Sequence, residues 1–182
     1  MNVAISVLSG GEAHRLVPQL SALLQDAVDS GASIGFLPPL ALAEAKQYWM
    51  SVAEEVDAGR RTLLIAQRHT EDAILGTVQL DLATKPNALH RAEVAKMLVH
   101  TQARRQGIAR QLMLAMEEKA RELGRTTLVL DTRHGDTAEP LYQSLQFNLV
   151  GLIPAYVKNV AGQLEATAVY YKLLSPAGEV HG

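Results

Sequence analysis

The stretch of residues 92–124 constrains the fold of this chain more than any other. Residues 92–99 are rich in valine, leucine and methionine, which is typical of a β-strand, and a polar, basic loop follows at residues 101–107. Beyond the loop, apolar residues recur at spacings of three and four, which predicts a helix; they are Ile108, Leu112, Ala115, Met116, Ala120 and Leu123. A strand, a basic loop and a helix start in this order predict a binding site for a negatively charged ligand.

The loop and the first turn of the predicted helix have the composition of an anion site. The first backbone N–H groups of a helix lack partners within it, and the helix dipole adds partial positive charge there. Gly107 allows close approach of the backbone, and the arginines at 104, 105 and 110 add three full charges. We expect a pyrophosphate here, although neither the GxxxxGK[ST] nor the GxGxxG spacing is present. The alternative is an ordinary surface turn whose arginines serve solubility.

Composition limits the other classes of function. The chain has 182 residues, 48% of them apolar and 20% charged, and a net charge of −2, which indicates one globular domain and argues against a general nucleic-acid binder. The absence of cysteine excludes disulfides, thiolate metal sites and a cysteine nucleophile. The six histidines have no metal-binding spacing, so no metal is expected. With no evident signal peptide or membrane-spanning run, we expect a cytoplasmic protein without a membrane partner.

The order of the predicted elements indicates a single α/β domain over residues 1–174, followed by a loose tail at 175–182. Strands are predicted at 3–8, 62–67, 73–84, 92–99, 126–131, 147–157 and 165–174, and helices at 13–29, 40–58, 108–123 and 137–146. Residues 9–11 are expected to close the first strand, Asp136 to cap the last helix, and residues 68–72 to form a turn. Because a helix separates the strands at 92–99 and 126–131, these should be parallel neighbours. We therefore expect one mixed sheet of about seven strands, flanked by about four helices.

Residues 104–109 read Arg-Arg-Gln-Gly-Ile-Ala and match the pattern R/Q-x-x-G-x-G/A of GNAT-type N-acetyltransferases. The chain resembles that family here, in the strand before, in the helix after, and in residues 138–147. The resemblance implies a GNAT-like fold in which the two central parallel strands splay apart, with acetyl-CoA as co-substrate between them. Arg105 and Ala109 stand where glycines are frequent in the family, and Thr101 replaces a frequent proline.

The resemblance also implies which residues bind the cofactor. Pantetheine would pair with the backbone of the central strand at Met97, Leu98 and Val99, where an N–H group would hold the thioester oxygen. Ala138 would lie beside the cofactor as well. The pyrophosphate would be bound by the loop and the helix start, that is, by Arg104, Arg105, Gln106, Gly107, Ile108, Ala109 and Arg110.

Tyr142 is the candidate general acid. It lies four residues after Ala138 and five before Phe147, and this Ala-x-x-x-Tyr pattern resembles the second GNAT motif, whose tyrosine lies near the cofactor sulfur. A phenol with an ordinary pKa of ~10 can protonate a leaving thiolate. The alternative is a packed tyrosine whose hydroxyl bonds the backbone. Gln146 and Gly135 depart from the family pattern, and the second departure removes one expected polar contact with the cofactor.

Glu93 and Asp131 are the candidate bases. Glu93 lies in the central strand, and Asp131 ends the neighbouring strand at the edge where such sheets bind ligands. Each could accept the proton of an amine through water or hold a substrate ammonium, so together they suggest a cationic acceptor. The alternatives are a solvated Glu93 paired with Arg91 or Lys96, and an Asp131 that caps the following loop. Without cysteine, direct attack of the amine on the thioester is favoured over a covalent acyl-enzyme.

Residues 31–36 and 85–94 resemble, within the family, the acetyltransferases that confer resistance to tabtoxin. This narrower resemblance implies a small-molecule amine acceptor and, specifically, a β-lactam-type amino-acid toxin. Another metabolite or antibiotic, a peptide amine, and a non-catalytic acyl-CoA-binding module stay open as alternatives. Phe36 and Trp49 either pack on the sheet or wall the acceptor pocket. The chain could be a monomer or a homodimer.

Overall fold

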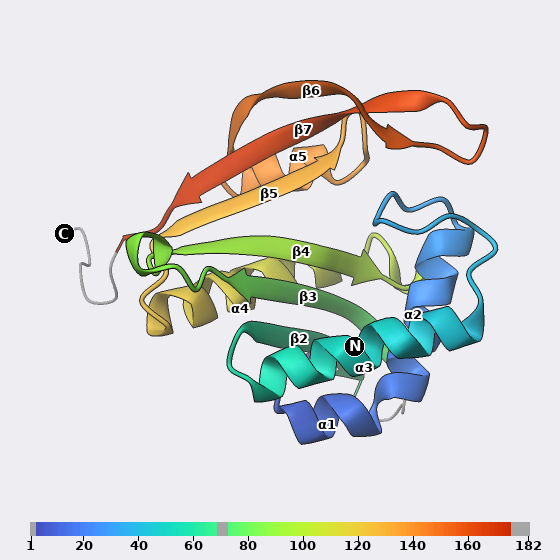
Figure 1. Ribbon diagram of the computed structural model, residues 1–182, viewed down its shortest axis with the longest axis horizontal. Coiled ribbons are helices and arrows are strands. Elements are labelled where there is room, and N and C mark those ends of the chain that lie inside the picture. The colour runs from blue at the N-terminus through green and yellow to red at the C-terminus, as the bar shows by residue number, and fades with distance from the viewer. Residues whose placement is uncertain (1–2, 69–72, 176–182) are drawn as a thin grey trace.

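The computed structural model of the protein describes residues 3–68 and 73–175 and is organised around a seven-stranded sheet (Figure 1). The strands are β1 (Val3–Leu8), β2 (Arg61–Arg68), β3 (Ile74–Leu82), β4 (Arg91–Val99), β5 (Thr127–Arg133), β6 (Asn148–Lys158) and β7 (Leu164–Leu173). The helices are α1 (Gly10–Arg15), α2 (Val17–Asp29), α3 (Leu42–Asp57), α4 (Ile108–Glu122) and α5 (Glu139–Ser144), with short 3-10 turns at Pro86–Ala88 and Thr101–Ala103. The structure describes only the first residue of the predicted turn at 68–72 and only the first residue of the predicted loose tail at 175–182. The rest of both segments lies outside the described residues.

The sheet confirms the predicted mixed topology with a parallel βαβ unit. Its strand order is β1-β2-β3-β4-β5-β7-β6, and all neighbours are antiparallel except β4 and β5. The parallel pair is joined at only three positions, residues 91–93 against 127–129. Beyond them β4 and β5 diverge (Figure 1), so the second half of β4 has no strand paired on that side. The splay implied by the family resemblance is therefore present.

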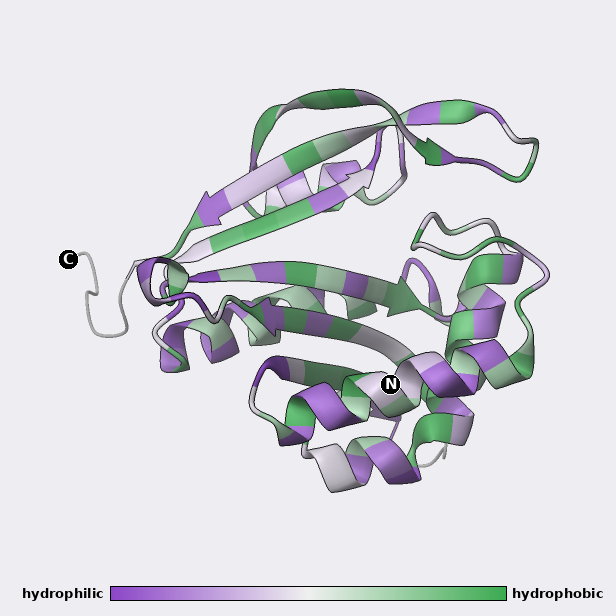
Figure 2. Ribbon diagram, viewed as in Figure 1, coloured by the Kyte–Doolittle hydropathy of each residue, from purple (hydrophilic) through white to green (hydrophobic). Residues whose placement is uncertain are grey.

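Helices cover both faces of the sheet around β1 to β4. α1, α2 and α3 lie on one face and α4 lies on the other (Figure 1). Along these helices hydrophobic and hydrophilic residues alternate in bands, as expected where one side packs on a sheet (Figure 2). The apolar residues on the buried side of α4 are each at most 1% exposed; they are Ile108, Leu112, Met113, Met116 and Ala120. One apolar core thus forms under α4 and a second under α1 to α3.

Trp49 is fully buried in the core under α1 to α3, which supports packing rather than ligand contact. Its ring meets that of Tyr48 edge-on with centres 5.1 Å apart, and Tyr48 meets Phe36 in the same way at 5.4 Å. Edge-on pairs of this kind stabilise a core beyond the area they bury. Neither Phe36 nor Trp49 lines the two cavities described below.

A β-bulge in β4 changes which face its side chains point to. β4 has two residues, Lys96 and Met97, where β3 has one. Lys96 adopts a φ of 49°, and its carbonyl accepts a hydrogen bond of 3.1 Å from the buried hydroxyl of Thr77. Val94 packs in the core under α4, whereas Leu98 packs in the opposite core. Residues four apart in an unbroken strand share a face, so the bulge reverses the faces of β4 at its centre.

The first predicted helix is divided in two, which gives five helices rather than about four. The first strand ends at Leu8 and is followed by residues 9–11, as predicted, but Ser9 is also the cap of α1, and Gly10 and Gly11 belong to that helix. The Ser9 hydroxyl accepts a hydrogen bond from the Glu12 N–H at 3.3 Å, and the Glu12 carboxylate accepts one from the Ser9 N–H at 2.8 Å. This capping box starts the helix before the predicted residue 13, and Leu16 separates α1 from α2.

The last predicted helix starts later than its sequence pattern indicates. Asp136 is not the cap, since its carboxylate accepts a hydrogen bond from the Ala138 N–H at 2.9 Å and closes a turn before the helix. Glu139 accepts from the Gly135 N–H at 2.6 Å instead of completing a capping box with Asp136. α5 therefore begins after Ala138, and its first turn is closed by a 3.2 Å bond from the Tyr142 N–H to the Ala138 carbonyl.

Candidate active site

Two cavities lie where β4 and β5 diverge. The larger cavity, of about 800 Å³, is lined by the end of β4, the start of α4, the end of α2 and the residues around the start of α5. The smaller cavity, of about 300 Å³, is lined by β4, β5, β6, α5 and residues 32–35. The two meet, because both are lined by Ala32, Met97, Asp136 and Ala138. Both volumes are typical of small-molecule sites.

The larger cavity brings together most of the residues expected to bind a cofactor. Those that line it are Met97, Leu98, Val99, Arg104, Arg105, Gly107, Ile108, Ala109, Arg110 and Ala138. Gln106 is not among them. Its side-chain amide donates to the Gln102 carbonyl at 3.2 Å and accepts from Arg68 at 3.2 Å. Gln106 therefore holds the loop in place rather than facing the cavity.

The start of α4 has the geometry of an anion site. Gly107 precedes the helix with a φ of 77°, a value that favours glycine. The helix begins its hydrogen bonding with the Gln111 N–H, which donates to the Gly107 carbonyl at 3.1 Å, so the N–H groups of residues 108–110 have no partner within the helix. The exposed side chain of Arg105 has no hydrogen-bond or ion-pair partner among the described residues. An anion at the start of α4 would be stabilised by the free N–H groups, by the helix dipole and by this guanidinium.

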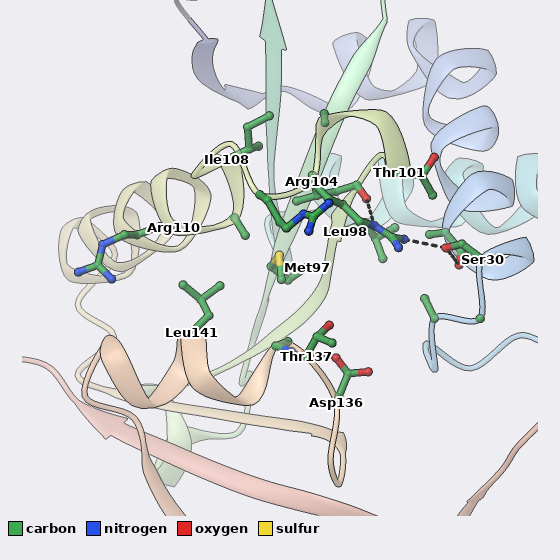
Figure 3. A pocket seen from close by; sticks show the side chains of 18 of the residues that line it. Ser30, Met97, Leu98, Thr101, Arg104, Ile108, Arg110, Asp136, Thr137 and Leu141 are labelled. Atoms are coloured by element: carbon green, nitrogen blue, oxygen red, sulfur yellow. Dashed lines mark hydrogen bonds between the residues drawn. The ribbon is translucent and has the colours of Figure 1, made fainter.

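Arg104 and Arg110 also line the larger cavity, but neighbouring residues hold them, as Figure 3 shows for Arg104. Arg104 donates from Nε to the Val99 carbonyl at 3.3 Å and from Nη2 to the Ser30 hydroxyl at 2.7 Å, which ties the loop to the end of α2. Arg110 donates to the Ser144 hydroxyl at 3.1 Å. Both arginines are exposed, and a bond from guanidinium to phosphate is stronger than one to a neutral oxygen. A phosphate could therefore take the place of the serine hydroxyls.

Asp26 of α2 supports the same loop and was not identified from the sequence. Its carboxylate accepts hydrogen bonds from the N–H and the hydroxyl of Thr101, at 2.8 and 2.7 Å. The imidazole of His100 lies 3.8 Å from it. No local pattern signals this contact, because 75 residues separate Asp26 from Thr101 along the chain.

Tyr142 lines the smaller cavity from α5. Its side chain is buried, and its hydroxyl has no hydrogen-bond partner among the described residues, which argues against the alternative of a tyrosine bonded to backbone. Burial raises the pKa of Tyr142, and the negative charges of Asp136 and Asp131 raise it further. The phenol therefore stays protonated at every pH at which the protein would work.

Glu93 and Asp131 line the smaller cavity from the adjacent strands β4 and β5. Partial burial raises the pKa of Glu93, and the carboxylates of Asp131 and Asp81 raise it further. Glu93 forms no ion pair with Arg91 or Lys96, and Asp131 accepts a hydrogen bond of 3.1 Å from Thr167 of β7 instead of capping its loop. Two carboxylates thus face one cavity, and the raised pKa of Glu93 makes it a candidate proton acceptor.

Lys96 lines the smaller cavity too, and sequence reasoning considered it only as an ion-pair partner of Glu93. The bulge turns it out of the core under α4, and its ammonium lies 5.6 Å from the centre of the Tyr48 ring. Burial lowers the pKa of Lys96, and the positive charge of Arg61 lowers it further. From the sequence, the face of the sheet on which Lys96 lies could be predicted only from the alternation of side chains along the strand. The bulge at Lys96 and Met97 breaks that alternation.

The described residues contain no group of three or more His, Asp or Glu side chains that could hold a metal ion, and none of their helices is long and apolar enough to cross a membrane. The central strands of the sheet part beside a helix start whose N–H groups and arginines favour an anion, and a second cavity meets the first, which leaves room for two ligands. The chain belongs to the Acetyltransferase (GNAT) family, whose model matches residues 23–147.

Known proteins agree with this membership. The chain is 30% identical over 138 residues to an uncharacterized N-acetyltransferase in the hisH-hisA intergenic region of Azospirillum brasilense. This match covers 75% of the present chain and 77% of that protein. A putative acetyltransferase structure from Acinetobacter baylyi superimposes with a TM-score of 0.80 at 16% identity, covering 99% of this chain and 97% of that one. The structure of YncA, a putative acetyltransferase from Salmonella typhimurium solved with acetyl-CoA, superimposes with a TM-score of 0.73 at 16% identity. The superposition covers 99% of this chain and 98% of that one. At such identities the two structures show a shared fold.

Proposed function

We propose that the protein transfers the acetyl group of acetyl-CoA directly to the amine of a small molecule. The observation that carries the proposal is the meeting of the two cavities at Met97 and Ala138. One cavity carries the positive charge and free N–H groups that suit a pyrophosphate, and the other carries an unpartnered phenol and two carboxylates. A thioester held at the junction would lie between the two sets of groups.

Acetyl-CoA fits the larger cavity by its chemistry. Arg105 and the N–H groups of residues 108–110 would hold the pyrophosphate, with Arg104 and Arg110 beside it. The unpaired edge of β4 at residues 97–99 would hold the pantetheine through backbone hydrogen bonds, since no strand competes for it. The structural neighbour YncA, which carries this cofactor, supports the assignment.

The smaller cavity supplies the proton transfers. Glu93 would take the proton of the acceptor ammonium, directly or through water, while Asp131 holds the ammonium by its opposite charge. The amine nitrogen then bonds to the thioester carbon and loses its second proton, the carbon–sulfur bond breaks, and Tyr142 gives its proton to the departing sulfur. The proton lost from nitrogen on bond formation restores the phenol, so the step balances. Burial raises the pKa of Tyr142, so the phenol would keep its proton until the sulfur develops negative charge, and the same burial would disfavour a bare thiolate beside it.

We further propose a β-lactam-type amino-acid toxin as the acceptor and the cytoplasm as the place of action, with residues 1–174 as the transferase domain. The toxin assignment depends on residues 31–36 and 85–94. Residues 32–35 line the smaller cavity, so the first of these segments would contact an acceptor bound there. A narrow cavity of about 300 Å³ suits a small molecule better than a folded protein.

Release of free CoA thiol from acetyl-CoA over a panel of amines tests the proposal. We expect saturable turnover with small amines, including the toxin. Tight binding of acetyl-CoA without turnover on any amine would instead indicate the non-catalytic acyl-CoA-binding module.

A further inference from the structure

Lys96 is the one cation among the described residues that line the smaller cavity. Its side chain is half-buried, and its ammonium forms no hydrogen bond or ion pair with the described residues. The centre of the Tyr48 ring lies 5.6 Å from the ammonium nitrogen. A Cβ built on Gly35 would lie 4.0 Å from that nitrogen, so the loop at 32–35 reaches it as well. A cation withdrawn from water without a counter-ion is unfavourable, and a ligand anion would relieve this.

The other charges near Lys96 do not supply that counter-ion. Arg61 donates to the Gln79 side-chain oxygen and to the Asp81 carboxylate, each at 2.7 Å, so Asp81 is already neutralised. Glu93 and Asp131 act on Lys96 only at a distance, since neither lies within 4.0 Å of the ammonium. Asp136 also lines the cavity, but Arg133 already pairs with it at 3.5 Å. The smaller cavity therefore presents the carboxylates of Glu93 and Asp131 and a separate cation without an ion-pair partner among the described residues.

The backbone at Lys96 is strained. Its φ of 49° lies in the left-handed region, which non-glycine residues seldom adopt. The hydrogen bond from the Thr77 hydroxyl to the Lys96 carbonyl fixes the bulge. Strained backbone of this kind is found most often where a side chain has a functional position.

We propose that Lys96 binds an acidic group of the acceptor while Glu93 and Asp131 hold its ammonium, which makes Lys96 the residue that selects acceptors with the charge pattern of an amino acid. The inference rests on the proposed function of the smaller cavity as the acceptor site. It predicts that a carboxylate carried by the acceptor contributes to binding, apart from the reactivity of the amine.

The test uses the chain of 182 residues and matched acceptors that differ in charge alone. Amino acids of two to six carbons are compared with their own primary amides, which keep the amine and remove the carboxylate. Thiol release gives KM and kcat for each, and calorimetry gives binding to protein saturated with CoA. The variants are Lys96→Met, which keeps the length of the side chain without the charge, Lys96→Arg, which keeps the charge, and Lys46→Met, a control at an exposed lysine of α3.

We expect the unmodified protein to prefer at least one acid over its amide. Lys96→Met should raise KM for that acid on the order of 10- to 100-fold, because a hydrogen bond to a charged group is lost, and leave the amide within about threefold. Lys96→Arg should restore part of the preference, and Lys46→Met should behave as the unmodified protein. Equal losses for acid and amide in Lys96→Met, seen mainly in kcat, would overturn the inference and make Lys96 a base or a structural residue. The absence of any preference for acids would overturn it too.

Calorimetry separates this inference from the proposed function. If no amine is turned over but acids bind more tightly than amides in a manner that needs Lys96, catalysis is excluded and the assignment of Lys96 stands. If amides are turned over as well as acids, catalysis stands and the assignment of Lys96 is wrong. If neither acids nor amides bind, the assignment is wrong as well.

Discussion

The two cavities are built by different means. The larger cavity depends on backbone: the unpaired edge of β4, the free N–H groups at the start of α4 and the positive φ of Gly107. The smaller cavity depends on side chains that no neighbour satisfies, namely the Tyr142 hydroxyl and the Lys96 ammonium, beside two carboxylates. A backbone site can bind the same cofactor throughout a family, whereas a site of unsatisfied charges depends on each residue and can change its substrate by single substitutions.

The shifted pKa values support this contrast. Those of Tyr142 and Glu93 are raised and that of Lys96 is lowered, each with burial as the largest cause, and all three side chains line the smaller cavity. Tyr48, which stacks beside Lys96, has a raised pKa for the same reason. Perturbed groups gathered in one cleft are typical of a site where protons move. Substitutions in the smaller cavity should therefore change turnover and acceptor binding, and those in the larger cavity should change the affinity for acetyl-CoA.

The largest effect is expected from Tyr142→Phe. Loss of the phenolic proton should lower kcat by about 10²-fold or more while the dissociation constant of acetyl-CoA stays unchanged, because the ring that packs beside Phe147 is kept. Thiol release and calorimetry measure the two quantities. Tyr171→Phe, which removes a hydroxyl on β7 outside both cavities, is the matched control. Full turnover in Tyr142→Phe would reassign Tyr142 to packing and weaken the contrast between the cavities.

Next in size are the carboxylates of the smaller cavity. Glu93→Gln should lower kcat by about 10- to 100-fold, as expected when a general base is lost. Asp131→Asn should mainly raise KM for the amine, since it removes the charge that holds the ammonium. Near-normal kinetics in both variants and in their combination would exclude the carboxylates from the reaction.

The pH profile gives these variants a second measurement. Glu93 must be ionised to act as a base, so activity should fall as pH falls through its raised pKa. Asp131→Asn removes a negative neighbour that contributes to that raised value, so the acidic limb of kcat should move to lower pH. In Glu93→Gln this limb should disappear. A limb that stays in place in Asp131→Asn would show that another group controls it.

The same contrast explains what the sequence could and could not predict. The larger cavity is made mostly of consecutive residues, a strand, a loop and a helix start, so the motif at 104–109 located it, apart from Gln106, which turns to Gln102 and Arg68. The smaller cavity draws its residues from five separate segments, whose meeting no spacing reveals. Lys96 was missed because strict alternation from Val94 would place it under α4, and the bulge that moves it away has no sequence signal.

In the larger cavity, Gly107→Val should raise KM for acetyl-CoA by about tenfold and leave KM for the amine unchanged. A Cβ at Gly107 meets nothing closer than 4.0 Å, so the effect comes from forcing a β-branched residue to a φ of 77°, at about 1–3 kcal/mol. Gly59→Val is the matched control, because Gly59 has a φ of 68°, open space around it and no part in either cavity. Equal changes for both substrates would argue against separate roles for the two cavities.

The smallest effect is expected from Asp26→Ala, which removes a support of the larger cavity without touching its lining. The Thr101 N–H and hydroxyl lose their acceptor, but both are near the surface and water can replace it, so the loss should be about 0.5–1 kcal/mol. KM for acetyl-CoA should rise about two- to fivefold as the loop before α4 loosens, and kcat should stay within error. Asp29→Ala, at an exposed position of the same helix end, is the control. A fall in kcat without a change in acetyl-CoA affinity would show that the α2 contact acts on the junction of the cavities, where Ala32 already lies, and not on the cofactor loop.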